Sequence, residues 1–215
     1  MAQSLADQAY DALRGAIAEG RLQPGERIRE VALAEELGIS RTPIREALQR
    51  LARDGLIQQD ARNGARVTEL SMAAIQELYD LRVILEGSAA RFAALSATAN
   101  DRQRLTAILA KEAEHLGDAV AMAKLNKLFH QGLCQAANNR FLSNAVATFS
   151  TTLLLLGPTT LAAGQRADES HAEHSAIIAA VGAGDAALAE RLMRGHIDRA
   201  REIRLAMFLE AGLGV

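Results

Sequence analysis

Residues 31–56, VALAEELGISRTPIREALQRLARDGL, constrain the fold of this chain more than any other stretch. Their apolar residues recur at helical spacing in two short runs, with Gly38 between the runs. Gly38 can adopt the positive φ that a tight turn between two helices needs. The apolar edge of the second run is formed by Ile44, Ala47, Leu48 and Leu51. Two short amphipathic helices that meet at a tight turn predict a helix-turn-helix.

The opposite face of the second helix is polar. Its side chains are Arg41, Thr42, Arg45 and Gln49. Arginine can bind guanine O6 and N7 or a phosphate, and threonine and glutamine can hydrogen-bond to phosphates or base edges. The N-terminus of the helix adds partial positive charge. This face therefore predicts DNA binding, and the spacing leaves open the alternative of a solvated face on a small helical hairpin.

The charge of the chain does not by itself indicate a nucleic-acid partner, because its formal net charge is only −2. The local balance is different. Residues 37–53 carry four arginines against one glutamate, which gives this segment a charge of +3. Such a local patch is enough for a dimer, since two copies add their phosphate contacts.

Two short strands are expected after the second helix, at residues 56–59 and 65–68. The Asn63-Gly64 pair between them is a strong signal for a tight turn. We expect this hairpin to form a wing whose tip, with Arg62, Asn63 and Gly64, approaches the minor groove or the DNA backbone. For Arg62, an ordinary surface arginine is an equally good interpretation.

From residue 71 the pattern changes to successive helices without a strand signal. We expect helices at residues 71–95, 101–116, 120–137, 141–156, 169–181 and 185 to about 210. The predicted fold class is therefore mainly α. Residues 1–70 form a winged helix-turn-helix domain, and residues 71–215 form an all-α six-helix bundle for effector binding and dimerisation.

Composition agrees with a globular helical protein, with 49% hydrophobic, 23% charged and only 3% aromatic residues. The single cysteine, Cys134, excludes an internal disulfide and suits a reducing cytosol; a small buried thiol is its expected role. The N-terminus lacks the apolar segment of a signal peptide, and residues 153–156 are far too short to span a bilayer. We expect a cytoplasmic protein without a membrane partner.

Histidines form a second group of candidate functional residues. His130, His174 and His196 lie on three different predicted helices, and Asn126 lies one turn before His130 on the same face. Helical bundles build metal sites from single residues that converge from several helices. Three imidazoles suit zinc, nickel or a similar divalent ion. From spacing alone, a histidine on a helix is more often a structural or surface residue, and the three need not converge.

The N-terminal motifs resemble a known family. SRTPIREALQRLARDGLI and the following NGARV, preceded by GRLQPGERI and LAEELGIS, are similar to the winged helix-turn-helix of the GntR family of bacterial transcription regulators. The resemblance covers about residues 5–70. It implies a homodimer that places two recognition helices in successive major grooves of a near-palindromic double-stranded operator.

The C-terminal motifs LYDLRVILEGSAARFAA, NKLFHQGL, AEHSAIIAAVGAGD and MRGHI resemble the effector domain of the FadR-like branch of this family, in its six-helix VanR-type version. The resemblance implies a bundle that binds a small organic acid and a divalent metal. The matching metal positions are Asn126, His130, His174 and His196. The family often has aspartate at the first position. Asn126 should hold the ion more weakly, or leave it to three histidines and water; the ion could be zinc, nickel or manganese.

The same resemblance implies that Arg82 faces the effector pocket and binds the carboxylate of a metabolite. The alternative is a structural ion pair with Glu86 at i+4. Asn144 is also expected to line the cavity, and His171 to lie at its mouth or on the surface. We therefore expect a metabolite-responsive transcription regulator, typically a repressor, and no enzyme.

Two other interpretations remain open. In the first, the ion itself is the signal, which a weak site with Asn126 favours. In the second, the bundle is a metal-dependent hydrolase, since three histidines with an open position could activate water. Against the hydrolase, Glu173 should point away from its neighbour His174 on a helix, so a general base is missing.

Overall fold

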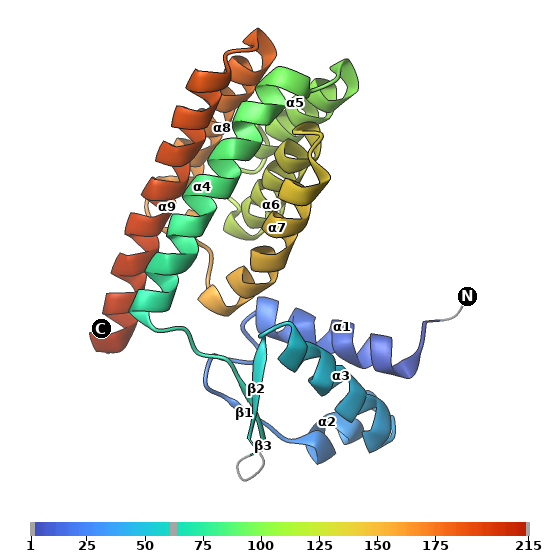
Figure 1. Cartoon of the computed structure of the whole chain (residues 1–215). Helices are drawn as coiled ribbons and strands as arrows, with labels where there is room; N and C mark the ends of the chain where they lie inside the picture. Colours follow the sequence, from blue (N-terminus) through green and yellow to red (C-terminus); the bar gives the residue numbers. More distant parts are fainter. Residues whose placement is uncertain (1–2, 61–63, 214–215) are drawn as a thin grey trace. The chain divides into compact units, whose positions relative to one another are not determined.

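The computed structural model describes residues 3–60 and 64–213, and these divide into two compact units (Figure 1). The first unit comprises the chain up to Ser71 together with Phe149–Pro158. The second comprises Met72–Thr148 and the chain from Thr159 onward. None of the described helices combines the length and apolarity that a bilayer crossing requires.

The first unit contains three helices and a small sheet. Its elements are α1 (Leu5–Ala18), β1 (Arg27–Ile28), α2 (Glu30–Leu37), α3 (Arg41–Arg53), β2 (Ile57–Asp60) and β3 (Gly64–Val67). The strands form an antiparallel sheet in the order β1-β3-β2. This is the predicted helix-turn-helix followed by a hairpin, to which β1 adds a third strand.

The turn between α2 and α3 forms as the sequence predicts. Gly38 has a φ of +65°, and its N–H donates to the carbonyls of the last turn of α2. The apolar edge of α3 is buried in the core of the unit through Ile44, Ala47, Leu48 and Leu51. Burial of this edge fixes which face of α3 is turned outward.

One segment from the second half of the sequence belongs to the first unit. The helix predicted at residues 141–156 is α-helical only over α7 (Arg140–Thr152) and continues as the 3₁₀ helix η1 (Leu153–Leu156). Leu155 of η1 is buried in the same core as Leu13 and Leu48. Four consecutive leucines have no periodicity, so the sequence could not show where the α-helix ends or which core these side chains join.

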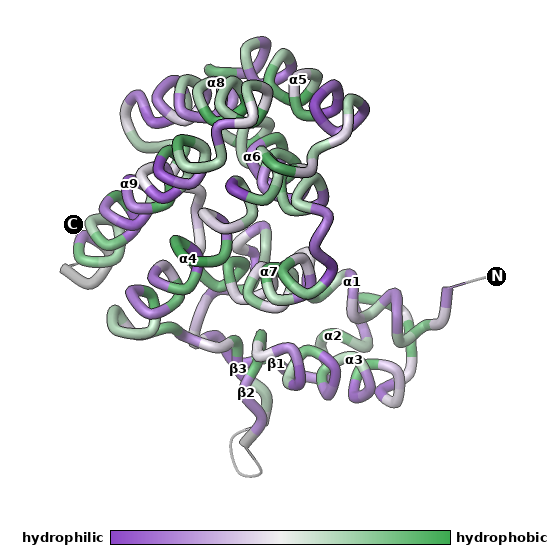
Figure 2. Tube along the Cα trace, turned by 45° about the horizontal axis from the view of Figure 1, so that its top comes forward, coloured by the Kyte–Doolittle hydropathy of each residue, from purple (hydrophilic) through white to green (hydrophobic). Residues whose placement is uncertain are grey.

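The second unit is the expected bundle of six α-helices within the described residues, with α7 running on into the first unit. Besides α7 they are α4 (Met72–Ser96), α5 (Ala99–Ala113), α6 (Ala119–Ala136), α8 (Arg166–Ala183) and α9 (Ala186–Leu213), with the 3₁₀ helix η2 (Thr160–Ala162) before α8. Hydrophilic and hydrophobic stretches alternate along these helices, as expected for amphipathic helices (Figure 2). Side chains cap several of them: Thr98 forms a capping box on α5, and Asp118 caps α6.

Two packing contacts position the interior of the bundle. α4 and α9 lie side by side (Figure 1), and Gly87 permits their close approach, since a Cβ there would be 2.8 Å from Arg194 Cγ. α8 contacts α4, α5, α6 and α9. Side chains on the inner face of α8 therefore meet side chains from most of the bundle.

The place of η1 in the first unit can be tested with Leu155→Ala. Removal of this buried side chain should lower the free energy of unfolding of the first unit by roughly 2–5 kcal/mol. Hydrogen exchange monitored by mass spectrometry should show faster exchange in α1 and α3. The exposed Leu209→Ala serves as control. Unchanged exchange in α1 and α3 would contradict this packing.

Candidate functional site

Three histidines from three helices meet inside the second unit. They are His130 on α6, His174 on α8 and His196 on α9, and one possible ligand atom from each lies within 4.8 Å of the others. His130 Nε2 and His196 Nε2 are 3.2 Å apart. His174 and His196 are buried, and His130 is half-buried. The predicted convergence of these histidines is therefore present in the fold.

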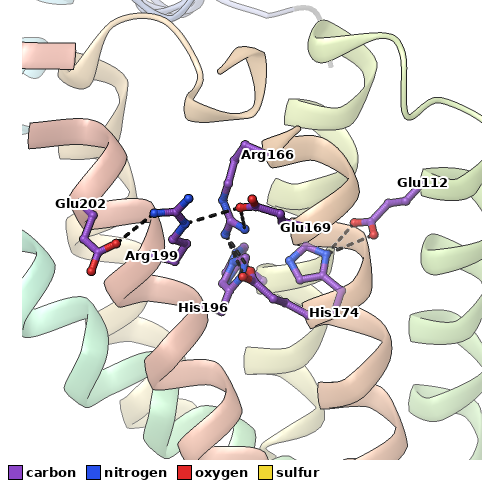
Figure 3. Close-up of polar contacts among 9 residues, drawn as sticks. Glu112, Arg166, Glu169, His174, His196, Arg199 and Glu202 are labelled. Atoms are coloured by element: carbon purple, nitrogen blue, oxygen red, sulfur yellow. Dashed lines mark hydrogen bonds and ion pairs between the residues drawn. The ribbon is translucent and has the colours of Figure 1, made fainter. Parts of the chain in front are cut away.

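Each of the three imidazoles has a glutamate at its other nitrogen. Glu86 Oε2 of α4 lies 2.5 Å from His130 Nδ1, and Glu173 Oε2 lies 2.6 Å from His196 Nδ1. Glu112 of α5 contacts His174 Nδ1 at 2.9 Å (Figure 3). At His174 and His196 the hydrogen bond to the carboxylate keeps the proton on Nδ1 and leaves Nε2 with a free lone pair. At His130 the close contact with Glu86 is an ion pair that favours the same tautomer. All three lone pairs are then directed into one small space.

These residues fit a divalent metal ion. His174 Nε2 is buried and has no hydrogen-bond partner among the described residues. Buried polar atoms without a partner are rare in folded proteins, and three facing lone pairs repel one another. A cation bound by the Nε2 atoms removes both costs. Three imidazoles with carboxylates behind them are a common donor set for zinc and related ions.

The pKa values keep two of these histidines in the ligand form. Burial lowers the pKa of His174 to about 4, against a weaker opposite effect of Glu112. The pKa of His196 also lies well below its ordinary value, first because of burial and then because of His174 and His130. Both imidazoles are therefore neutral at pH 7, and neutral imidazole is the form that binds metal.

Arg82 forms the ion pair with Glu86 that the i+4 spacing allows. Arg82 Nε donates to Glu86 Oε1 at 2.7 Å, and both side chains are buried. Burial alone would raise the pKa of Glu86, but Arg82 and His130 hold it well below its usual range. The structure therefore places Arg82 behind His130, with Glu86 between them. A contact from Arg82 to an effector stays a prediction.

Arg166 was not identified from the sequence, although it is almost completely buried, with 2% of its surface exposed. Its Nη2 donates to Glu173 Oε2 at 2.7 Å and lies 3.3 Å from His196 Nδ1. Figure 3 shows the guanidinium group directed toward His196. Glu173 points away from His174, as expected. Its carboxylate contacts Nδ1 of His196 on α9 instead.

The other residues predicted for the bundle site have different positions. Asn126 is half-buried one turn before His130, and its role as a metal ligand stays a prediction. Asn144 is exposed on α7, which gives no support for a place in an enclosed pocket. His171 Nδ1 lies 3.3 Å from the buried Glu112. Burial raises the pKa of Cys134 to about 12, so it is a protonated core thiol.

The polar face of α3 is exposed as predicted. Arg41, Thr42, Arg45 and Gln49 all lie on the surface of the first unit. Arg45 Nε forms an ion pair with Glu30 Oε2 at 2.8 Å, and this pair is solvent-accessible and therefore weak. At the wing, Gly64 has a φ of +77° and pairs with Asp60. Arg62 and Asn63 lie outside the described residues.

The sheet brings together two further arginines that sequence reasoning missed. Arg27 of β1 and Arg66 of β3 are direct partners in the ladder, and both are exposed. They are far apart in the sequence, and the strand β1 is only two residues long. No local pattern could predict this pairing, which adds positive charge beside the wing.

Comparison with known proteins decides what these two units are. A family model described as "Bacterial regulatory proteins, gntR family" matches residues 5–67, and one described as "FCD domain" matches residues 77–199. The chain belongs to the GntR family. It is a transcription regulator with a DNA-binding N-terminal domain and an effector-binding FCD domain, and the resemblance drawn from its motifs is confirmed.

Individual relatives agree with this family. The "Probable D-xylose utilization operon transcriptional repressor" of Paenarthrobacter nicotinovorans is 32% identical over 90% of this chain and 86% of its own length. The "Uncharacterized HTH-type transcriptional regulator YdhC" of Bacillus subtilis is 38% identical, but the match covers 64% of this chain and only 62% of that protein. Both are described as regulators, which removes the interpretation as a hydrolase.

A solved structure shows the same fold. Escherichia coli McbR/YncC superimposes with a TM-score of 0.79, covering 96% of this chain and 100% of its own, at 24% identity.

The histidine pKa values predict that the metal-free protein is sensitive to acid. The folded state holds the pKa of His174 at about 4 against an ordinary 6.5, so the unfolded chain binds more protons between these two values. The free energy of unfolding should therefore fall as the pH drops through this window, by up to roughly 1.4 kcal/mol per pH unit for each such histidine. Urea unfolding of chelator-treated protein measures this slope. His174→Gln should show a shallower slope, and an equal slope would contradict the pKa assignment.

Proposed function

We propose that this protein is a dimeric, metabolite-responsive repressor of the bacterial cytosol, with a divalent metal and a small organic acid bound in its FCD domain. The observation that carries this proposal is the cluster of three histidines inside the bundle, each with a glutamate at Nδ1, in a chain that also has a helix-turn-helix. A bound ion and effector would bias the bundle toward one arrangement. A coupling of about 1–3 kcal/mol to operator affinity is enough for regulation.

On the DNA side, each protomer of the dimer would insert α3 into the major groove of one half-site of a near-palindromic operator. Arg41 and Arg45 would contact bases or phosphates, with Thr42 and Gln49 beside them. Arg62, Asn63 and Gly64 of the wing would contact the backbone or the minor groove. The exposure of the α3 residues supports this assignment.

On the effector side, His130, His174 and His196 would hold zinc or nickel, with Asn126 as a fourth, weaker ligand. When bound, the ion supplies positive charge that attracts the carboxylate of an effector. Glu86, Glu112 and Glu173 orient the three imidazoles. A second candidate function, metal sensing by the ion itself, is favoured by the neutral amide of Asn126, since a weaker site can empty and refill.

Operator affinity is the measurement that separates these candidates. An operator is first selected from random DNA with the purified protein, and its affinity is then measured with and without chelator, zinc, nickel and a panel of small organic acids. An organic acid that changes affinity only in metal-loaded protein supports the metabolite response. Affinity that follows free metal without any organic acid supports metal sensing. Absence of sequence-selective DNA binding would overturn the proposal.

Arg45→Ala tests the reading face of α3. If Arg45 contacts a base, operator affinity should fall by about 1–3 kcal/mol, and selectivity should relax at one position of each half-site. Fluorescence anisotropy with the selected operator and its single-base variants measures both effects. Arg21→Ala, an exposed arginine of the same unit, is the control. Equal affinity for Arg45→Ala and wild type would show that Arg45 is merely solvated.

His174→Ala tests the metal site. The variant should retain DNA binding, since α3 is unaltered, but lose most of its metal, since one of three imidazole ligands is gone. Elemental mass spectrometry of untagged protein gives the ratio of metal to chain. His115→Ala, which removes a half-buried histidine outside the cluster, is the matched control. Full occupancy in His174→Ala would contradict the assignment.

A further inference from the structure

The inner face of α8 carries a row of buried polar groups. Arg166, Ser170 and His174 are each four residues apart, so they lie on one face in successive turns. Ser170 and His174 are fully buried, and Arg166 is 2% exposed. Each keeps at least one polar atom without a hydrogen-bond partner among the described residues. These atoms are Arg166 Nε, Arg166 Nη1, Ser170 Oγ and His174 Nε2.

Burial of these unpaired polar atoms lowers the stability of the folded protein unless a ligand binds to them. A buried hydroxyl or guanidinium N–H that loses its water and gains no partner destabilises the folded protein. A metal ion accounts for His174 Nε2 but cannot bind the N–H groups of Arg166, which only donate. The remaining atoms are two guanidinium nitrogens, which only donate, and a serine hydroxyl, which can donate as well as accept. The positive charge of Arg166 favours an anion as their common acceptor.

The neighbours of Arg166 leave these donors available. Its Nη2 is engaged with Glu173. Glu169 Oε2 lies 3.7 Å from Nη1, too far for a hydrogen bond, and accepts from Arg199 Nε at 3.4 Å instead (Figure 3). Arg82, the arginine expected to bind the effector, donates to Glu86 and has no unpaired buried nitrogen among the described residues. Arg166 is thus better placed than Arg82 to bind an anion.

We propose that Arg166 and Ser170 form the carboxylate-binding site for the effector, and that the effector is a small organic acid with one carboxylate in this site. This inference rests on the proposed function. It assigns anion recognition to α8 rather than to Arg82. Arg166 donates from Nε or Nη1 and Ser170 donates from Oγ. Because α8 also carries His174 and contacts four other helices, a ligand bound there can alter the packing of the bundle.

The test uses the full-length, zinc-loaded protein and two probes of equal size, glycolate and its neutral amide glycolamide. Isothermal titration calorimetry should show binding of glycolate and much weaker binding of glycolamide, because the amide lacks the negative charge. Inorganic phosphate is the third probe. Phosphate or glycolamide binding as tightly as glycolate would overturn the assignment to a carboxylate, and so would the absence of glycolate binding.

Ser170→Ala tests the anion site without altering Arg166. Replacement of Arg166 would also remove its hydrogen bond to Glu173 and disturb the fold. The variant should bind glycolate roughly tenfold more weakly, as expected for one lost hydrogen bond to a charged group. Its thermal midpoint without ligand should equal or exceed that of wild type, because the hydroxyl has no partner in the folded protein. A hydroxyl with only a structural role would lower the midpoint and leave glycolate affinity unchanged.

Ser88→Ala is the matched control, because Ser88 Oγ donates to the Ile84 carbonyl on α4. It should leave glycolate affinity at the wild-type value. Wild-type affinity in Ser170→Ala would overturn the inference. If zinc content and operator binding are intact in that case, the proposed function still stands. If wild-type protein binds no operator, the proposed function fails independently of glycolate.

Discussion

The contact between a glutamate carboxylate and the Nδ1 atom of a histidine, repeated three times, is the constraint on which the effector domain depends. Glu86, Glu112 and Glu173 come from α4, α5 and α8, and they orient imidazoles on α6, α8 and α9. Five of the six bundle helices thus contribute to one polar cluster. Burial of so many polar groups is tolerated only if nearly all are paired. The few unpaired atoms therefore mark the positions where ion and ligand are expected.

α8 connects the parts of this cluster. It carries Arg166, Ser170, Glu173 and His174 within three turns, and it contacts α4, α5, α6 and α9. With the proposed metal and effector sites, α8 would present a metal ligand, the carboxylate behind another ligand and an anion-binding arginine, and it would respond to both metal and effector. Arg82, by contrast, acts through Glu86 on His130. Regulation would then begin on α8 rather than on the helix that follows the DNA-binding domain.

Much of the fold was predictable because the signals are local. The turn at Gly38, the buried edge of α3 and the six bundle helices all follow from apolar spacing and from turn and cap residues within a few positions. The three histidines were also found, since each lies on a predicted helix. Glu112 was not, because nothing in its sequence neighbourhood distinguishes a fully buried carboxylate from the exposed acids beside it. The pairing of Arg27 with Arg66 and the place of Leu155 in the first core likewise depend on distant contacts.

The sequence by itself determined the family, the order of the elements and the three histidines, because periodicity and short motifs report the local structure of the backbone. Only the tertiary structure decided which charges are buried together. It paired Arg82 with Glu86 and placed the carboxylate of Glu173 at Nδ1 of His196. It also left Arg166 and Ser170 with polar atoms that have no hydrogen-bond partner among the described residues. The physical reason is that the cost of burying a charge depends on its neighbours in space, and those neighbours come from helices far apart in the sequence.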